Sequence, residues 1–201
     1  MITVLLADDQ AMVRAALATL LGLEPDLDVV GEVGRGDEVE AAVRQHRPDV
    51  VLMDVEMPGM DGIAATAAVK AAAPKTRVLI VTTFGRPGFL RRGLKAGADG
   101  FVVKDTPARE LADAVRRVHS GLRVVDPQLA TDSLLAGDSP LTARESDVLR
   151  AARDGGTVSR IAARVFLSEG TVRNHLSAAM GKTGASTRAE AVRIAEDNGW
   201  L

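Results

Sequence analysis

Short apolar runs alternate with longer segments of helical periodicity through the first 120 residues. The longer segments are rich in alanine, with apolar residues every three or four positions, whereas the short runs are rich in valine, leucine and isoleucine. Strands that alternate with helices predict βαβ units with right-handed crossovers. The predicted strands lie at about 2–7, 28–33, 49–53, 77–82 and 100–103. We therefore expect a flavodoxin-like, doubly wound α/β domain with a parallel five-stranded sheet and five helices, the last at about 107–119.

The last third of the chain has helical patterns only. Thr142 and Glu145 form a capping box at the start of the first predicted helix, which ends at Gly155 and Gly156. Ser168 caps the third and longest helix. The later three helices are predicted at about 158–164, 169–182 and 187–197. A short helix joined to a longer one by a tight turn predicts an all-α, four-helix domain of the helix-turn-helix type.

Between these two regions, residues 121–138 lose the periodicity. This stretch contains the turn-forming residues Asp126-Pro127 and Gly137, and Ser139-Pro140 follows it. We interpret it as a linker with one short helical turn near 128–135. The predicted organisation is a first domain over 1–120, a linker over 121–138 and a second domain over 139–201.

Composition narrows the class of protein and its compartment. The chain has no cysteine, which excludes disulfides and thiolate zinc sites and fits a reducing cytoplasm. No apolar stretch approaches the ~18–20 residues needed to cross a bilayer, and no basic segment precedes Ile2 as in a secretory signal. We therefore expect a soluble cytoplasmic protein without membrane contact. Residues 139–201 carry nine basic and seven acidic side chains, a mild excess that is compatible with nucleic acid binding.

Polar side chains stand at the carboxyl ends of four predicted strands. Asp8 and Asp9 follow the first strand, Asp54 the third, Thr82 the fourth and Lys104 the fifth. In an open parallel sheet these ends meet at one crevice, so we expect the five side chains to lie together. Clustered carboxylates need a cation among them, and an oxygen-rich set without histidine or cysteine suits Mg²⁺. Taken singly, the aspartates also fit a helix-capping role, and the lysine and threonine fit ordinary surface positions.

The first domain resembles the receiver domain of bacterial two-component response regulators. The resemblance rests on the run Asp54-Val-Glu-Met-Pro-Gly-Met-Asp-Gly62 and on Lys104 after Gly100-Phe-Val-Val103. It implies that Asp54 accepts a phosphoryl group and that Phe101 is an aromatic switch. The implied Mg²⁺ ligands are Asp9 and Asp54 directly, Asp8 through water and the backbone carbonyl of Glu56, while Thr82 and Lys104 contact the phosphoryl oxygens and Thr82 takes part in the switch.

The third helix of the second domain has two different faces. Val172, Leu176 and Ala179 share one face, and Arg173, Asn174 and Ser177 lie on the opposite one. From periodicity alone, a DNA-binding domain and an ordinary helical bundle with a polar face fit about equally well. The segments Leu141-Thr-Ala-Arg-Glu145 and Leu167-Ser-Glu-Gly-Thr-Val-Arg-Asn-His-Leu176 resemble the DNA-binding domain of the LuxR/NarL/FixJ family. The resemblance implies base contacts from Arg173, Asn174 and Ser177 and phosphate contacts from Thr171 and Lys182.

The two resemblances together imply a phosphorylation-dependent transcription regulator. A sensor histidine kinase would phosphorylate Asp54, the chain would form a homodimer and the dimer would bind promoter DNA, with RNA polymerase as a candidate further partner. Two runs, Leu23–Val30 and Val81–Phe89, are similar to regulators of fatty-acid desaturation. The competing interpretations are a Mg²⁺-dependent phosphatase or phosphotransferase with an aspartyl nucleophile and a protein-interaction output without DNA binding. We expect no enzymatic turnover beyond self-phosphorylation.

Overall fold

The computed structural model describes residues 1–83, 87–135 and 139–201, which group into two compact units. Along the chain the first unit runs to Thr131 and the second from there to the C-terminus, apart from a short segment before Phe89. In the described residues, no helix is long and apolar enough to cross a membrane. Each unit is described by itself below.

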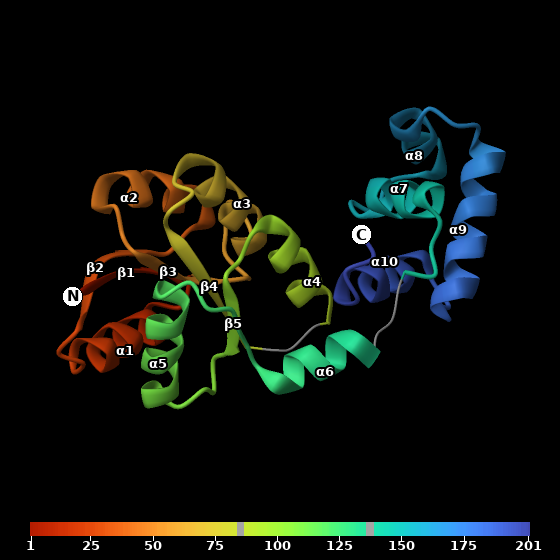
Figure 1. Cartoon of the computed structure of the whole chain (residues 1–201). Helices are drawn as coiled ribbons and strands as arrows, with labels where there is room; N and C mark the ends of the chain where they lie inside the picture. The colour runs from red at the N-terminus through yellow and green to blue at the C-terminus, as the bar shows by residue number, and fades with distance from the viewer. Residues whose placement is uncertain (84–86, 136–138) are drawn as a thin grey trace. The chain divides into compact units, whose positions relative to one another are not determined.

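The first unit contains a parallel sheet with helices on both faces (Figure 1). Its elements are β1 Ile2–Ala7, α1 Ala11–Gly22, β2 Leu27–Val33, the 3-10 helix η1 Gly36–Glu38, α2 Val39–His46, β3 Val50–Asp54, α3 Gly62–Ala72, β4 Arg77–Thr82, α4 Pro87–Ala96, β5 Gly100–Val103, α5 Ala108–His119 and β6 Val124–Val125. The strand order is β2-β1-β3-β4-β5-β6, with every pair parallel. This order confirms the predicted doubly wound architecture.

The structure adds a sixth strand that the sequence did not predict. β6 pairs with β5 at the edge of the sheet, where the backbone N–H of Asp126 donates to the carbonyl of Phe101 at 2.9 Å. Two residues are too short to show a period, so the segment was interpreted as linker. The helical turn predicted near 128–135 is helix α6 Pro127–Leu135, and Asp126 caps it by accepting from the backbone N–H of Gln128 at 2.8 Å.

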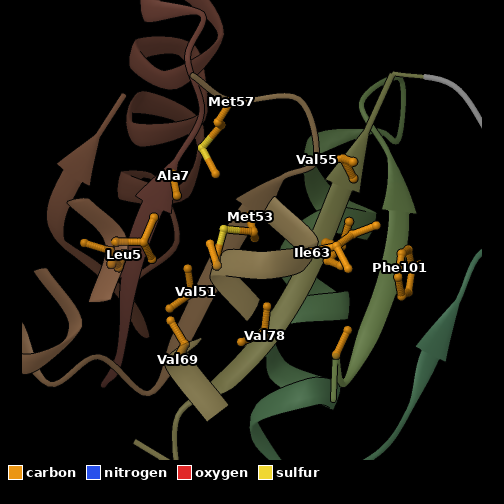
Figure 2. Close-up of a cluster of buried hydrophobic side chains, with 14 of the residues drawn as sticks. Leu5, Ala7, Val51, Met53, Val55, Met57, Ile63, Val69, Val78 and Phe101 are labelled. Atoms are coloured by element: carbon orange, nitrogen blue, oxygen red, sulfur yellow. The ribbon is translucent and has the colours of Figure 1, made fainter. Parts of the chain in front are cut away.

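Two apolar layers hold the helices onto the sheet. Alternate residues of each strand point to opposite faces, so one layer packs against α2, α3 and α4 and the other against α1 and α5. Figure 2 shows the first layer, in which Met53 and Val78 lie near Ile63 and Val69 of α3. Both faces of the sheet are covered by helices. Polar side chains of the central strands can therefore reach solvent only where the strands end.

The second unit is the predicted four-helix domain. The helices are α7 Ala143–Ala152, α8 Val158–Val165, α9 Glu169–Thr183 and α10 Arg188–Asp197. Thr142 and Glu145 make both hydrogen bonds of the predicted capping box, and Thr157, Ser168 and Thr187 cap the other three helices. The inward faces share one core, which includes Val148, Leu149, Ile161, Val172 and Ala191.

Candidate functional site

The five predicted strand-end residues lie together at the carboxyl-terminal ends of the parallel strands. Asp8 follows β1, Asp54 ends β3, Thr82 ends β4 and Lys104 follows β5. The backbone N–H of Lys104 donates to the carbonyl of Thr82 at 2.7 Å, which holds the ends of β4 and β5 together. This parallel register places the side chains in the crevice that parallel α/β sheets use for ligands.

The three carboxylates converge. Asp8, Asp9 and Asp54 each offer an oxygen within 4.8 Å of the other two. Asp8 and Asp54 are buried at 3% and 4% exposure, while Asp9 is exposed. The ammonium nitrogen of Lys104 lies between the buried pair, 2.7 Å from Asp8 Oδ2 and 2.9 Å from Asp54 Oδ2. A buried cation therefore compensates the buried negative charges, and Asp9 leaves one side of the cluster open to solvent.

Burial and pairing shift two pKa values in the pocket. Burial raises the pKa of Asp54, although the hydrogen bond and charge of Lys104 act in the opposite direction. For Lys104, burial alone would lower the pKa, but the hydrogen bonds from its ammonium group to Asp8 and Asp54 outweigh this and raise it. Lys104 therefore stays protonated at neutral pH, and Asp54 is a carboxylate that water solvates poorly.

The turn after Asp54 is built around close backbone packing. Asp54 Oδ1 accepts from the backbone N–H of Val55 at 2.7 Å, and the N–H of Gly62 donates to the carbonyl of Val55 at 2.8 Å. A Cβ atom at Gly62 would lie 1.8 Å from the carbonyl oxygen of Asp54, so only glycine fits there. Asp61 caps α3 by accepting from the N–H of Ala64 at 2.7 Å. The loop after β3 is thereby folded back onto the Asp54 carboxylate.

The remaining receiver-like residues divide between the pocket and the core. Thr82 is buried at the end of β4, and Glu56 lies exposed on the turn after Asp54. Phe101 is fully buried in the apolar layer shown in Figure 2. The structure thus places Phe101 inside the core rather than on the surface, and its role as a switch stays a prediction.

The recognition-type helix α9 presents the predicted polar face. Val172, Leu176 and Ala179 are buried in the domain core, whereas Arg173 and Asn174 are exposed. Ser177 is exposed on the same helix, and Thr171 lies in its first turn, where its hydroxyl lies 2.8 Å from that of Ser168. Arg173 forms an ion pair with Glu169, one turn earlier, at 2.8 Å. An exposed Arg-Asn pair on the early part of a second helix suits base contacts in a DNA groove.

The two domains match two family descriptions. Residues 4–116 match the response regulator receiver domain, and residues 139–195 match the bacterial regulatory proteins of the luxR family. The chain belongs to the response regulator family. This response regulator combines a receiver domain with a LuxR-type DNA-binding domain, so its class is that of transcription regulators rather than of classical enzymes. The phosphatase interpretation is therefore not supported.

Similar proteins match the response regulator over its whole length. The uncharacterized transcriptional regulatory protein YvfU of Bacillus subtilis (strain 168) is 41% identical over 201 residues, with 100% of both chains covered. The transcriptional regulatory protein DesR of the same strain is 40% identical over 201 residues, with the same coverage. The likeness to regulators of fatty-acid desaturation stays a prediction.

Solved structures agree with this assignment. ChrA, the response regulator of a heme-sensing two-component system, is 34% identical with a TM-score of 0.60, and the match covers 100% of this chain and 98% of that one. The two-component response regulator RcsB in its DNA complex is 25% identical with a TM-score of 0.70, and the match covers 98% of each chain. The predicted fold class is therefore confirmed for each of the two domains.

Lys182, a predicted phosphate contact, forms an ion pair within its own domain. Its ammonium group forms an ion pair with the buried Glu145 at 2.7 Å, and the same carboxylate oxygen accepts from the backbone N–H of Thr142 at 2.7 Å. The hydrogen bond from Lys182 lowers the pKa of Glu145. Lys182 therefore ties α9 to the capping box of α7. This pairing joins residues far apart in the sequence, so helical periodicity could not reveal it.

Sequence reasoning missed two receiver residues, one that contacts the site and one that packs against Phe101. Arg14 donates from Nη1 to the backbone carbonyl of Asp8 at 2.5 Å. Gly93 of α4 faces Phe101 so closely that a Cβ atom would lie 2.2 Å from the ring atom Cζ. A single arginine or glycine within a helical pattern carries no signal of its own, and the only clue is that Arg14 follows Asp9 by five residues.

Proposed function

We propose that a sensor histidine kinase phosphorylates this response regulator on Asp54, and that the phosphorylated chain dimerises and binds promoter DNA. The observation that carries this proposal is the convergence of three carboxylates and one ammonium group in a single pocket. Asp54 is the carboxylate that ends a central strand and is held by the closed turn that follows it. RNA polymerase is a candidate partner at the promoter.

The pocket supplies the nucleophile for the phosphoryl transfer and an ammonium group in contact with it. A carboxylate oxygen of Asp54 attacks the phosphorus of a phosphohistidine, or of a small acyl phosphate, in the donor. The new P–O bond forms as the bond from phosphorus to the donor breaks, and the donor takes that electron pair. Lys104 is protonated and in contact with Asp54, so it can shift from the carboxylates to the oxygens of the arriving phosphoryl group. Thr82, at the end of β4, is the proposed hydroxyl contact.

The donor set of the pocket fits Mg²⁺. Carboxylate oxygens are ligands that Mg²⁺ prefers, and the cluster contains no nitrogen or sulfur donor. Asp9 and Asp54 would hold the ion directly, Asp8 through water, and the backbone carbonyl of Glu56 would add a ligand. When bound, Mg²⁺ neutralises charge on the carboxylates and on the transferring phosphoryl group.

Regulation of transcription requires that the charge added to Asp54 by phosphorylation alters DNA binding. By analogy with other phospho-residues, phosphorylation takes the side chain from one negative charge to about two at neutral pH. Thr82 and Phe101 respond, and the surface around α4, β5 and α5, or around α1 and α5, changes its affinity for a second copy. One helix-turn-helix module buries only ~600–1,000 Å² on DNA, so dimerisation supplies avidity of ~10²–10⁴. We expect DNA half-sites about 10 bp apart. The proposed base contacts are Arg173, Asn174 and Ser177, and the proposed phosphate contacts are Thr171 and Lys182. To contact a phosphate, Lys182 would leave its ion pair with Glu145.

The Asp54→Ala variant tests the proposal. We expect light scattering to report a dimer when the wild-type chain is treated with acetyl phosphate and Mg²⁺, and a monomer for the variant under the same conditions. Asp28→Ala, which removes an exposed carboxylate from β2, is the matched control and should dimerise like wild type. Dimerisation of Asp54→Ala as complete as that of wild type would refute phosphorylation at Asp54 as the trigger.

A further inference from the structure

Arg14 joins the loop that carries the aspartate pair to the neighbouring strand. Its side chain is 20% exposed and leaves the first turn of α1. Nη1 donates to the backbone carbonyl of Asp8 at 2.5 Å, and Nε lies 3.3 Å from Glu32 Oε2 on β2. One guanidinium group therefore holds two acceptors in different parts of the fold, the loop after β1 and strand β2.

Asp8 is restrained at every polar atom. Its N–H donates to the carbonyl of Val33 at 3.1 Å, and its Oδ1 accepts from the N–H of Gln10 at 2.9 Å. Its Oδ2 lies 2.7 Å from the ammonium of Lys104, and its carbonyl accepts from Arg14. Of the two side chains in this set, Lys104 also contacts Asp54, and in the proposed function it shifts to the oxygens of the phosphoryl group. Arg14 is then the side chain that still fixes the peptide between Asp8 and Asp9.

We propose that Arg14 is a positioning residue for divalent cation binding in the receiver pocket. By fixing the Asp8 carbonyl against β2, it keeps the carboxylates of Asp8 and Asp9 directed toward Asp54. Arg14 acts on the ligand carboxylates indirectly, through its hydrogen bond to the backbone carbonyl of Asp8. The inference rests on the proposed function, because it concerns the Mg²⁺ that assists phosphoryl transfer to Asp54.

The chemistry of the contact requires arginine. The planar guanidinium group offers donors in a fixed fork, which lets it reach a carbonyl and a carboxylate at once. A lysine ammonium on a flexible stem can satisfy one of the two acceptors without fixing their separation. Removing a group that orients metal ligands commonly weakens metal affinity ~10–100-fold.

Isothermal titration of the full-length chain with Mg²⁺ measures the effect. We expect the dissociation constant for Mg²⁺ to rise ~10–100-fold in Arg14→Met, and to rise less in Arg14→Lys and in Glu32→Gln. Arg44→Met is the matched control, since Arg44 makes an exposed pair with Glu40 on α2 of the same domain, and it should leave the constant unchanged. Circular dichroism in the presence of a chelator checks that each variant is folded.

The outcomes separate this inference from the proposed function. An unchanged Mg²⁺ dissociation constant in folded Arg14→Met overturns the positioning role, even if thermal stability falls. If Arg14→Met does not fold, Arg14→Lys and Glu32→Gln decide, and wild-type Mg²⁺ affinity in both overturns it. A wild-type chain that binds Mg²⁺ but takes no phosphoryl group from acetyl phosphate refutes the proposed function alone. Wild-type phosphorylation with unchanged Mg²⁺ affinity in Arg14→Met refutes the inference alone.

Discussion

The receiver pocket and the face of α9 place functional groups in opposite physical settings. In the pocket, Asp8 and Asp54 are buried and share one ammonium group. On α9, Arg173 has an exposed side chain, and its ion pair to Glu169 lies on the same helix. In the pocket, the energy of each charged group therefore depends on the others. On α9, the exposed polar groups are separate from one another, and the apolar face of the helix packs in the domain core.

This difference predicts how each region responds to substitution. Removing one member of a buried charge cluster leaves the others uncompensated, so the fold itself is affected. Removing one exposed residue from α9 changes what the helix can bind and leaves the domain stable. The variants below test this contrast, from the largest expected effect to the smallest.

Lys104→Met should give the largest loss of stability. The ammonium group lies within 3 Å of two buried carboxylates, so its removal leaves Asp8 and Asp54 without a counter-charge. We expect the free energy of unfolding of the receiver domain to fall by about 3–5 kcal/mol, measured by urea unfolding followed by circular dichroism without Mg²⁺. Added Mg²⁺ should restore part of this loss.

Lys75→Met is the matched control for that variant, because Lys75 is exposed. Its unfolding free energy should stay within about 0.5 kcal/mol of the wild-type value. Equal stability of Lys104→Met and Lys75→Met would show that the pocket charges are not coupled as the contacts indicate.

Gly93→Ala should destabilise the receiver domain through the core that surrounds Phe101. The added methyl group would lie 2.2 Å from Phe101 Cζ and 2.9 Å from Ile80 Cδ1, so the ring or α4 must move. Overpacking of this kind costs about 1–3 kcal/mol, which urea unfolding measures. Gly22→Ala meets no atom within 4 Å and should keep or raise stability. If the two variants behave alike, the packing of Phe101 against α4 is not tight.

Arg173→Ala should change DNA affinity without changing stability. We expect binding to a selected cognate site to weaken by about 1–3 kcal/mol, seen in gel-shift midpoints over a series of salt concentrations. The exposed pair with Glu169 contributes only about 0.3–0.5 kcal/mol to stability. Arg150→Ala, which removes an exposed arginine from α7, is the control. An unchanged midpoint for Arg173→Ala at every salt concentration would exclude Arg173 as a DNA contact.

The smallest effect concerns the pH dependence of stability. Because the pKa of Asp54 is raised above its ordinary value of 3.8, the folded state holds more protons than the unfolded state between the two values. The contribution of Asp54 to stability therefore falls as pH rises through that window. The stability gained by Asp54→Asn should increase over the same window and then level off. A gain that is constant or shrinks with rising pH would contradict the raised pKa.

The sequence predicted most of the sheet and the pocket because both depend on local pattern. Apolar runs locate the strands, and parallel pairing brings their polar ends, Asp8, Asp54 and Lys104, to one edge. Strand β6 escaped prediction because two residues have no period. Helix α6 Pro127–Leu135 lies where the sequence predicted a short helical turn, near 128–135.

Three contacts that the sequence did not predict join different elements of the fold. Glu145 and Lys182 are 37 positions apart, and Gly93 meets Phe101 across a helix–sheet contact. Arg14 reaches Glu32 on a neighbouring strand. Periodicity says which face a residue occupies, but it does not say which residue of another element lies opposite.

The direct test of phosphorylation at Asp54 is to locate the phosphoryl group. The wild-type chain is incubated with acetyl phosphate and Mg²⁺, the acyl phosphate is reduced with borohydride, and tandem mass spectrometry identifies the residue converted to homoserine. We predict conversion at position 54 alone. Conversion at Asp8 or Asp9 instead, or at no aspartate of the pocket, would contradict the account.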